Sequence, residues 1–243
     1  MIARAAACRW CWLAQGEPME SLTAAHAIVL IVHLLLFVYW LGGDVGVFYS
    51  SRFVVDSSRT REARLTAAKI MLDLDLIPRI CMSLMLTVGG LLSEFYGVRH
   101  PAWQMAGLIA LGPFWLGMVL VLHVREGTAA AHRIARFDFY FRWFIIAAVV
   151  ASVVHSLATG RLDAQPWLAA KLLIFAFLVF CGLMIRVGMP PFVEGFRALV
   201  ANQVTPETDA RMQASLGRMR PWVLAIWVGV LAAAVLGVVK PGG

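Results

Sequence analysis

Apolar residues run along this chain in six long stretches, separated by segments that hold most of the charged residues. A helix needs about 20 apolar residues to cross a hydrocarbon core about 30 Å thick. No strand-like alternation of polar and apolar residues runs through the stretches. The pattern predicts an all-α fold, an integral membrane bundle of six transmembrane helices that forms a single transmembrane domain over residues 1–243. The spans cover about residues 27–49, 76–95, 103–123, 142–159, 167–187 and 222–239.

Two of the segments between the stretches have helical patterns of their own. Residues 59–75 place charged and apolar side chains on separate faces and are expected to form an amphipathic helix that continues into the second span. The segment 201–217 is expected to be a polar loop. Within it, Thr205-Pro206-Glu207 is typical of a helix N-terminus.

The composition agrees with a membrane protein and excludes a separate soluble domain. Of the 243 residues, 61% are hydrophobic and 14% are charged, whereas a soluble domain has about 45–50% and about 25%. The lipid bilayer is therefore the first partner that the sequence predicts.

The formal net charge of +7 invites a nucleic-acid interpretation, but the distribution of the basic residues favours another one. Lysine and arginine are dense in 52–69, 125–142 and 186–220, and sparse in the loops between them. This alternation follows the positive-inside rule. It predicts a multi-pass protein of the cell inner (plasma) membrane, with both termini, including residues 1–24, on the non-cytoplasmic side and with no nucleic-acid partner.

Ionisable residues inside apolar spans are the candidate functional residues, because desolvating them in lipid costs several kcal/mol. At about 1.5 Å per residue, His33 lies about 9 Å below the outer end of its span. Lys171 lies about one turn below the start of the fifth span, and His155 lies a few residues before the end of the fourth. The predicted topology places all three at one outer level.

Two imidazoles on facing helices can supply the axial nitrogens of a membrane b-type haem. We therefore expect His33 and His155 to be metal ligands, and nearby Lys171 or Arg161 to pair with the haem propionates. The alternative is structural: each histidine hydrogen-bonds a neighbouring helix, and Lys171 extends its ammonium to the interface.

A second level of polar residues lies towards the inner side. Asp44 follows two glycines and is expected to form an ion pair with Arg79 or Arg142. A proton relay or a second cofactor is the alternative for this level, and His123 with His132 could hold a second haem.

Two short motifs resemble a known family. Residues 31–43, with His33, Trp40 and Gly43 at regular spacing and Arg52 further on, resemble the first helix of the HemJ-type protoporphyrinogen IX oxidases and the related CopD-like membrane proteins. Residues 167–173 resemble the family's Trp-x-x-x-Lys-Leu helix. The resemblance covers less than half of the chain. It implies haem binding at His33, with Trp40 in the cofactor site, and a catalytic role for Lys171.

These observations favour a haem-b-binding integral membrane protein with a redox role, in electron transfer or in a porphyrinogen-oxidase-like reaction. Whether it is an enzyme stays open at this point. One alternative is a CopD-like protein that transports copper or another small solute. The other is a non-catalytic membrane subunit that packs on copies of itself or on other subunits of a larger complex.

Overall fold

The computed structural model describes residues 23–125 and 127–242, and this part of the chain contains seven helices and no strand. All of them except α6 are long and apolar enough to cross a membrane. The all-α fold with six membrane-spanning helices is therefore confirmed, and the chain is a multi-pass membrane protein. The helices are α1 (Ala24–Val54), α2 (Arg61–Phe95), α3 (Ala102–Val124), α4 (Ala129–Ala158), α5 (Pro166–Gly188), α6 (Pro190–Val200) and α7 (Pro206–Val239). Most of the segment 1–24 lies outside the described residues.

Threonine side chains start four of the six long helices. Thr23, Thr60, Thr128 and Thr205 each accept a hydrogen bond from the backbone N–H three residues later. Such a bond satisfies one of the backbone donors that a helix N-terminus leaves free. These caps explain why the helices begin outside the apolar stretches that revealed them.

The segment 201–217 is mostly helical, and the expected polar loop is wrong for most of it. At Thr205 the side chain and backbone form a reciprocal capping box with Thr208, and Pro206 occupies the first turn of α7. Met212 and Ser215 of this extension are fully buried. The expectation for 59–75 is confirmed, because α2 runs without interruption from Arg61 through Pro78 to Phe95.

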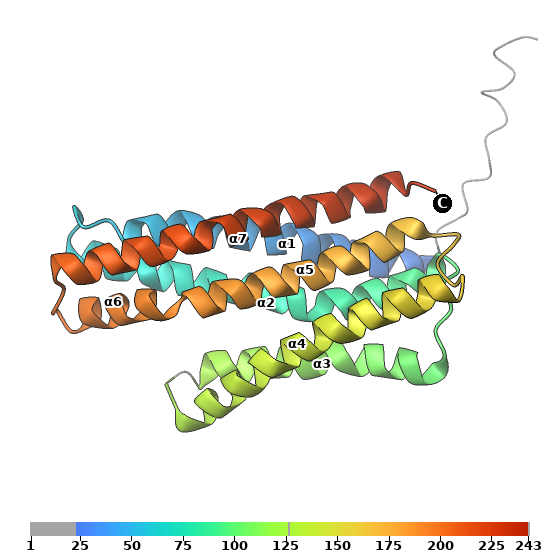
Figure 1. The fold of residues 1–243 in the computed structure, drawn as a ribbon, viewed down its shortest axis with the longest axis horizontal. Helices are drawn as coiled ribbons and strands as arrows, with labels where there is room; N and C mark the ends of the chain where they lie inside the picture. The colour runs from blue at the N-terminus through green and yellow to red at the C-terminus, as the bar shows by residue number, and fades with distance from the viewer. Residues whose placement is uncertain (1–22, 126, 243) are drawn as a thin grey trace, which may run out of the picture.

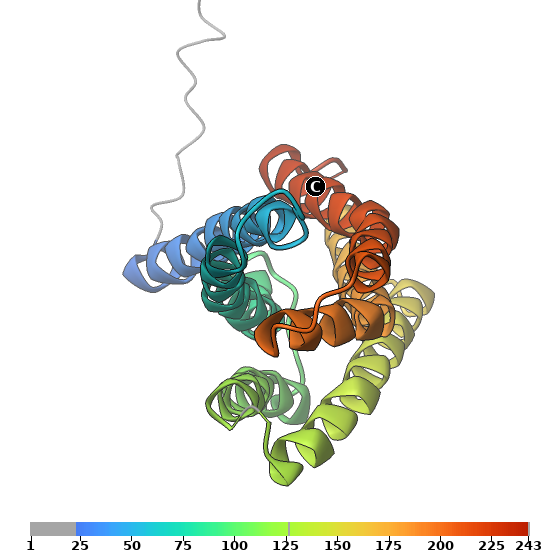
Figure 2. The ribbon, with the colours of Figure 1, turned by 90° about the vertical axis from the view of Figure 1, so that its left-hand side faces the viewer.

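The six long helices form a closed circle in which each packs on its neighbours. The order around the circle is α1, α2, α3, α4, α5 and α7, and the short α6 lies mainly against α7 (Figures 1 and 2). The start of α1 and the end of α7 lie at one end of the bundle, called here the terminal side. The opposite end holds the α1–α2, α3–α4 and α6–α7 connections and is called the basic side.

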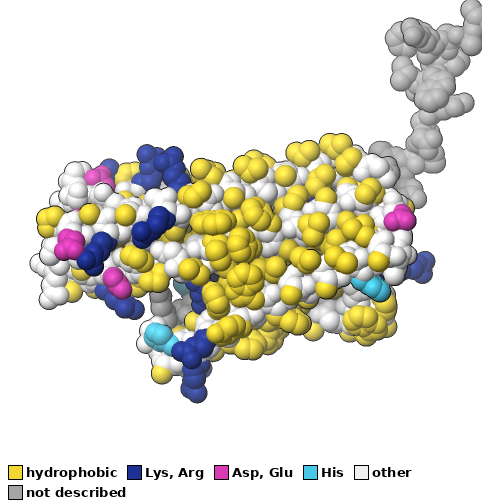
Figure 3. Space-filling model, in the orientation of Figure 1, with side chains coloured by type: hydrophobic (Ala, Val, Ile, Leu, Met, Phe, Trp, Pro, Cys, Tyr) yellow, Lys and Arg dark blue, Asp and Glu magenta, His cyan; other side chains and the backbone are white. Residues whose placement is uncertain are grey.

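Apolar side chains fill the middle of the circle. Trp40, Trp115, Phe175 and Val179 are buried there with neighbours from every long helix. The outward faces are apolar as well, and Figure 3 shows a broad hydrophobic belt between charged ends. A belt of this kind is suited to lipid tails.

A buried ion pair closes the basic side. Arg64 of α2 is 4% exposed and donates two hydrogen bonds to the Asp209 carboxylate of α7, at 3.2 and 2.6 Å, and one to the Val54 carbonyl at 2.8 Å. These bonds hold the start of α2 and the start of α7 against the end of α1.

Candidate functional site

An aromatic contact in the core aligns α1 with α5. The rings of Trp40 and Phe175 meet edge to face, with centroids 6.4 Å apart. Both helices run from the terminal side to the basic side. His33 is two turns above Trp40, and Lys171 is one turn above Phe175, so the long lysine side chain can reach the level of the imidazole. Lys171 also acts electrostatically on His33, so the two predicted site residues lie near each other.

The imidazole of His33 lies against a glycine of α2. A Cβ built on Gly89 would be 3.4 Å from His33 Cε1 and 3.9 Å from its Nδ1. Within the described part of the chain, the buried Nδ1 has no hydrogen-bond partner. A ring nitrogen that is shielded from solvent and left without a hydrogen-bond partner is uncommon. This atom is therefore a candidate ligand atom on the terminal side.

Lys171 lies close to a second lysine that the sequence did not single out. Its Nζ is 5.7 Å from the centre of the Trp167 ring, and a Cβ on Gly237 of α7 would be only 2.8 Å from it. Lys240, the next charge along α7, places its Nζ 4.2 Å from the centre of the Tyr96 ring. Among residues 23–125 and 127–242, no carboxylate lies within 4 Å of either ammonium.

Aromatic rings join these cations to the end of α2. His26 stacks on Phe95 at 4.8 Å and meets Tyr96 edge to face, and Tyr96 in turn meets Trp167 at 5.6 Å. The Nε2 of His26 is buried without a partner in the described structure. We call His33, Lys171, Lys240, Tyr96 and Trp167 the terminal-side layer.

Three predicted residues do not join this layer. His155 is exposed on α4, which packs on α5 and α3 and not on α1, so the expected pairing of His155 with His33 is wrong. Arg161 donates to the Gln104 side chain at 3.1 Å and to the Arg99 carbonyl at 2.7 Å, which ties it to the α2–α3 connection. Trp40, 4% exposed, is part of the apolar core.

The polar residues towards the basic side form a closed network around Asp138. This carboxylate is 1% exposed and accepts from Arg142 at 2.9 Å and from Arg186 at 2.7 Å. Arg142 also donates to Met82 Sδ at 3.5 Å, and Arg186 donates to the Ala135 carbonyl. Asp138 had not been selected from the sequence, although its i, i+4 spacing to Arg142 is a recognisable signal.

The network corrects the expected ion pair of Asp44. Arg142 pairs with Asp138, and Arg79 pairs with Asp75 one turn earlier in α2. Neither guanidinium bonds Asp44, whose buried Oδ2 has no partner in the described residues. The expectation was wrong because an aspartate one turn away on the same helix reaches each arginine more easily than one on α1.

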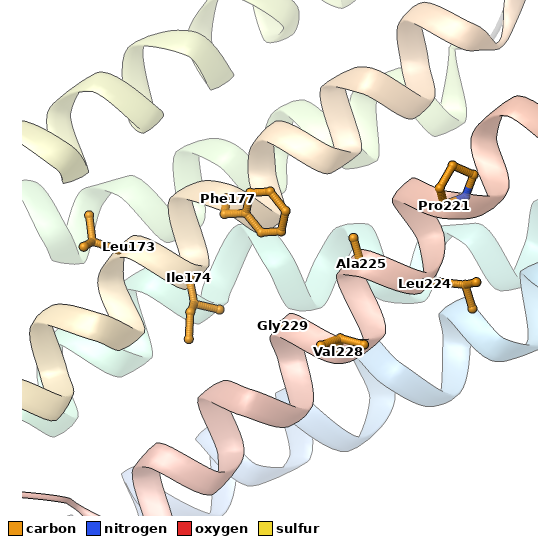
Figure 4. A pocket seen from close by; sticks show the side chains of 8 residues that line it. All are labelled: Leu173, Ile174, Phe177, Pro221, Leu224, Ala225, Val228 and Gly229. Atoms are coloured by element: carbon orange, nitrogen blue, oxygen red, sulfur yellow. The ribbon is translucent and has the colours of Figure 1, made fainter.

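An apolar groove lies elsewhere, between α5 and α7. It has a volume of about 640 Å³, and Figure 4 shows its lining, with Leu173, Ile174 and Phe177 from α5 facing residues 221–229 of α7. Every side chain in the lining is apolar, so the groove offers no ligand atom for a metal and no charge for a polar molecule.

Within the described residues, no three His, Cys, Asp or Glu side chains lie together as a metal-binding group. What the terminal-side layer offers is one imidazole nitrogen, two ammonium groups and flat aromatic faces. Such a set suits a planar ligand that carries carboxylates and takes one nitrogen ligand from the protein. Comparison with protein-family models, with curated proteins and with solved structures finds no match for this chain.

Proposed function

We propose that this protein binds haem b in the inner (plasma) membrane of the cell and has a redox role there. The observation that carries the proposal is the buried His33 Nδ1, which has no hydrogen-bond partner among the described residues and lies near Lys171. An imidazole nitrogen that is free of hydrogen bonds is available to bind iron. The bound haem would supply one-electron chemistry, while the chain controls its ligation and burial.

The charges of the layer support a ligand with carboxylate groups. Lys171 and Lys240 are two cations at the membrane interface without an acidic partner in the described structure. Propionates at the edge of a porphyrin would neutralise both, and charge-assisted hydrogen bonds of this kind are about twice as strong as neutral ones. In this proposal Lys171 takes over the role for which Arg161 had also been considered.

The resemblance to the HemJ-type oxidases supports the same residues. His33 and Lys171 carry the two family motifs, and both lie in the terminal-side layer. A porphyrinogen-oxidase-like reaction and simple electron transfer are both compatible with this layer. In the first case the Lys171 ammonium would bind a carboxylate of the substrate, which would make Lys171 a catalytic residue.

An absorption spectrum of the detergent-purified protein tests the proposal. We expect a Soret band and α-bands that sharpen on reduction, and we expect His33→Ala to abolish them. The matched control is His155→Ala, which removes an exposed imidazole from another helix and should leave the spectrum unchanged. Size-exclusion chromatography and the helical circular dichroism signal establish that each variant is folded.

Two results would contradict haem binding, and a third would contradict His33 as the ligand. A folded protein that stays colourless in haem-supplied cells and binds Cu(I) would favour the CopD-like transport function. A colourless, metal-free protein that purifies with other membrane chains would favour the role of a subunit. A spectrum that survives His33→Ala but not His155→Ala would move the ligand to α4.

A further inference from the structure

A second pocket opens near the basic side, where α3 and α4 diverge from α2. It has a volume of about 260 Å³ and is separate from the terminal-side layer. Figure 3 shows this hollow with Lys, Arg and His side chains at its edge. The ionisable side chains in its lining are Asp75, Arg79, His123, His132 and Arg186. We call it the basic pocket.

Among the described residues, the arginines in and beside the basic pocket outnumber the carboxylates that pair with them. Asp75 pairs with Arg79, whereas Asp138 alone serves both Arg142 and Arg186. Three guanidinium groups therefore share two carboxylates, and they lie close enough for Arg79 and Arg186 to repel the charge of Arg142. A guanidinium group without its own carboxylate, in a partly apolar environment, favours the binding of an anion from outside the protein.

Unused hydrogen-bond donors face this space. Arg186 uses one N–H for Asp138 and one for the Ala135 carbonyl, which leaves three of its five donors free. Arg79 forms one ion pair, with Asp75, and its side chain is 51% exposed. The Nδ1 of His132 bonds the Thr128 carbonyl at 2.9 Å, so Nε2 is the nitrogen left for a ligand.

The other half of the lining is apolar and comes from the same helices. Leu76, Val119, Leu122 and Ala135 are among the residues that provide it. Asp75 lies about 30 Å along α2 from Phe95, which is the thickness of a hydrocarbon core. The pocket is therefore at the depth of lipid phosphates, with charge on one side and an acyl-chain surface on the other.

We propose that the basic pocket binds the phosphate of an anionic phospholipid from the adjacent leaflet, with Arg79 and Arg186 as its ligands and the apolar lining against the upper acyl chain. Free inorganic phosphate shares the charge but cannot use the apolar half. This site does not depend on haem binding, and it gives the three arginines a shared counterion.

Native mass spectrometry of the full-length protein in detergent tests the proposal, with phosphatidylglycerol and phosphatidylcholine of identical acyl chains as probes. We expect phosphatidylglycerol to bind about tenfold more tightly than phosphatidylcholine, and Arg79→Gln to remove about that factor. The matched control is Arg133→Gln. It loses the same charge from an exposed position beside His132 but outside the pocket lining, and its affinity should stay within about twofold.

A second variant guards against a misfolded Arg79→Gln protein. The double variant Asp75→Asn, Arg79→Gln keeps the net charge of the pocket and leaves no carboxylate unpaired, and it should still bind phosphatidylglycerol about tenfold less tightly. Equal affinity for the two lipids, or equal losses in Arg79→Gln and Arg133→Gln, would overturn the proposal. So would thermal stabilisation by inorganic phosphate that matches the stabilisation by the lipid.

Discussion

The protein has two levels of buried polar groups, and they differ in how far those groups satisfy one another. Towards the basic side, the Asp138 Oδ2 atom accepts from Arg142 and Arg186, and Arg186 also donates to a backbone carbonyl, so each of these three charges has at least one partner, although Asp138 Oδ1 and Asp44 Oδ2 have none among the described residues. On the terminal side, His33 and the two lysines have none within the described residues. The first level joins α4 to α5, whereas the second leaves an imidazole nitrogen and two ammonium groups without protein partners in the described structure.

The difference matters because an unpaired buried polar group costs about 1–3 kcal/mol, and more if it is charged. A folded protein retains an unpaired buried group where another contribution to its function compensates for the lost stability, and ligand binding is the usual one. The terminal-side layer is therefore the candidate site because it combines the unpaired Nδ1 of His33 with two ammonium groups that have no carboxylate partner in the described structure.

The largest effect is expected from the satisfied level. Asp138→Ala leaves the nearly buried Arg142 and the half-buried Arg186 without their carboxylate, and breaking a buried pair in this way costs about 3–5 kcal/mol. A thermal or denaturant unfolding series in detergent measures it, with Asp138→Asn as the milder variant. Wild-type stability of Asp138→Ala would show that the network does not hold the helices.

The next largest loss of stability is expected where two helices are in close contact. Two adjacent glycines of α1 provide a matched test. A Cβ on Gly43 would lie 2.8 Å from Pro78 Cδ, whereas a Cβ on Gly42 meets nothing within 4 Å. Gly43→Val should therefore lower the free energy of unfolding by about 1–3 kcal/mol through overpacking. Gly42→Val makes the same chemical change and should stay near wild type in the same unfolding series. Equal losses would assign the effect to helix propensity instead of packing.

The unsatisfied level should respond in ligand binding and not in folding. Lys171→Ala removes a cation that has no acidic partner in the described structure, so the unfolding midpoint should barely move. Haem retention on dilution, followed by the Soret band, should weaken about tenfold because one charge-assisted bond is lost. Lys171→Arg should retain most of it, and Lys69→Ala, an exposed lysine on the basic side, should have no effect. Unchanged retention in Lys171→Ala would separate the lysine from the haem site.

The smallest effect is expected in the α1–α2 connection, which belongs to neither level. The hydroxyl and the backbone N–H of Ser58 donate to Asp56 and hold the pKa of its carboxyl below the ordinary value, with help from Arg59. Because the pKa of Asp56 is lower in the folded state, the ionised carboxylate stabilises the fold at pH values above the pKa of the unfolded state. This small contribution disappears as the pH falls through the pKa of the folded state. In an NMR titration, Ser58→Ala should raise the pKa of Asp56, and the stability at neutral pH should fall only slightly because the group is exposed. An unchanged titration would exclude the serine as the cause.

Much of the fold could be predicted from the sequence, because membrane spans leave a strong signal. Lipid requires every backbone group of a span to be bonded internally, so long apolar runs become helices. The level of His33 and Lys171 followed from counting residues along α1 and α5. The start of α7 at Pro206 was visible as a capping signal, but the buried face of residues 206–217 was hidden in a segment that looked like a polar loop, and α6 (Pro190–Val200) was not predicted.

Which face of each helix turns towards the core could not be predicted in the same way. In a soluble helix the polar face marks the outside, but here lipid and core are both apolar, so α4 carries no mark that would show His155 pointing away from α1. The role of Lys240 was equally hidden, because a left-handed backbone conformation ends α7 and brings that side chain over Tyr96.

The sequence by itself determined the number of spans and the depth of each ionisable residue, since both depend only on residue count and on the cost of exposing polar groups to lipid. Tertiary structure alone decided which of those residues meet. Rotation and neighbour choice of the helices are set by side-chain packing between distant segments. That packing gave Asp138 two arginine partners, turned His155 outward, and left the buried Nδ1 of His33 without a hydrogen-bond partner in the described structure.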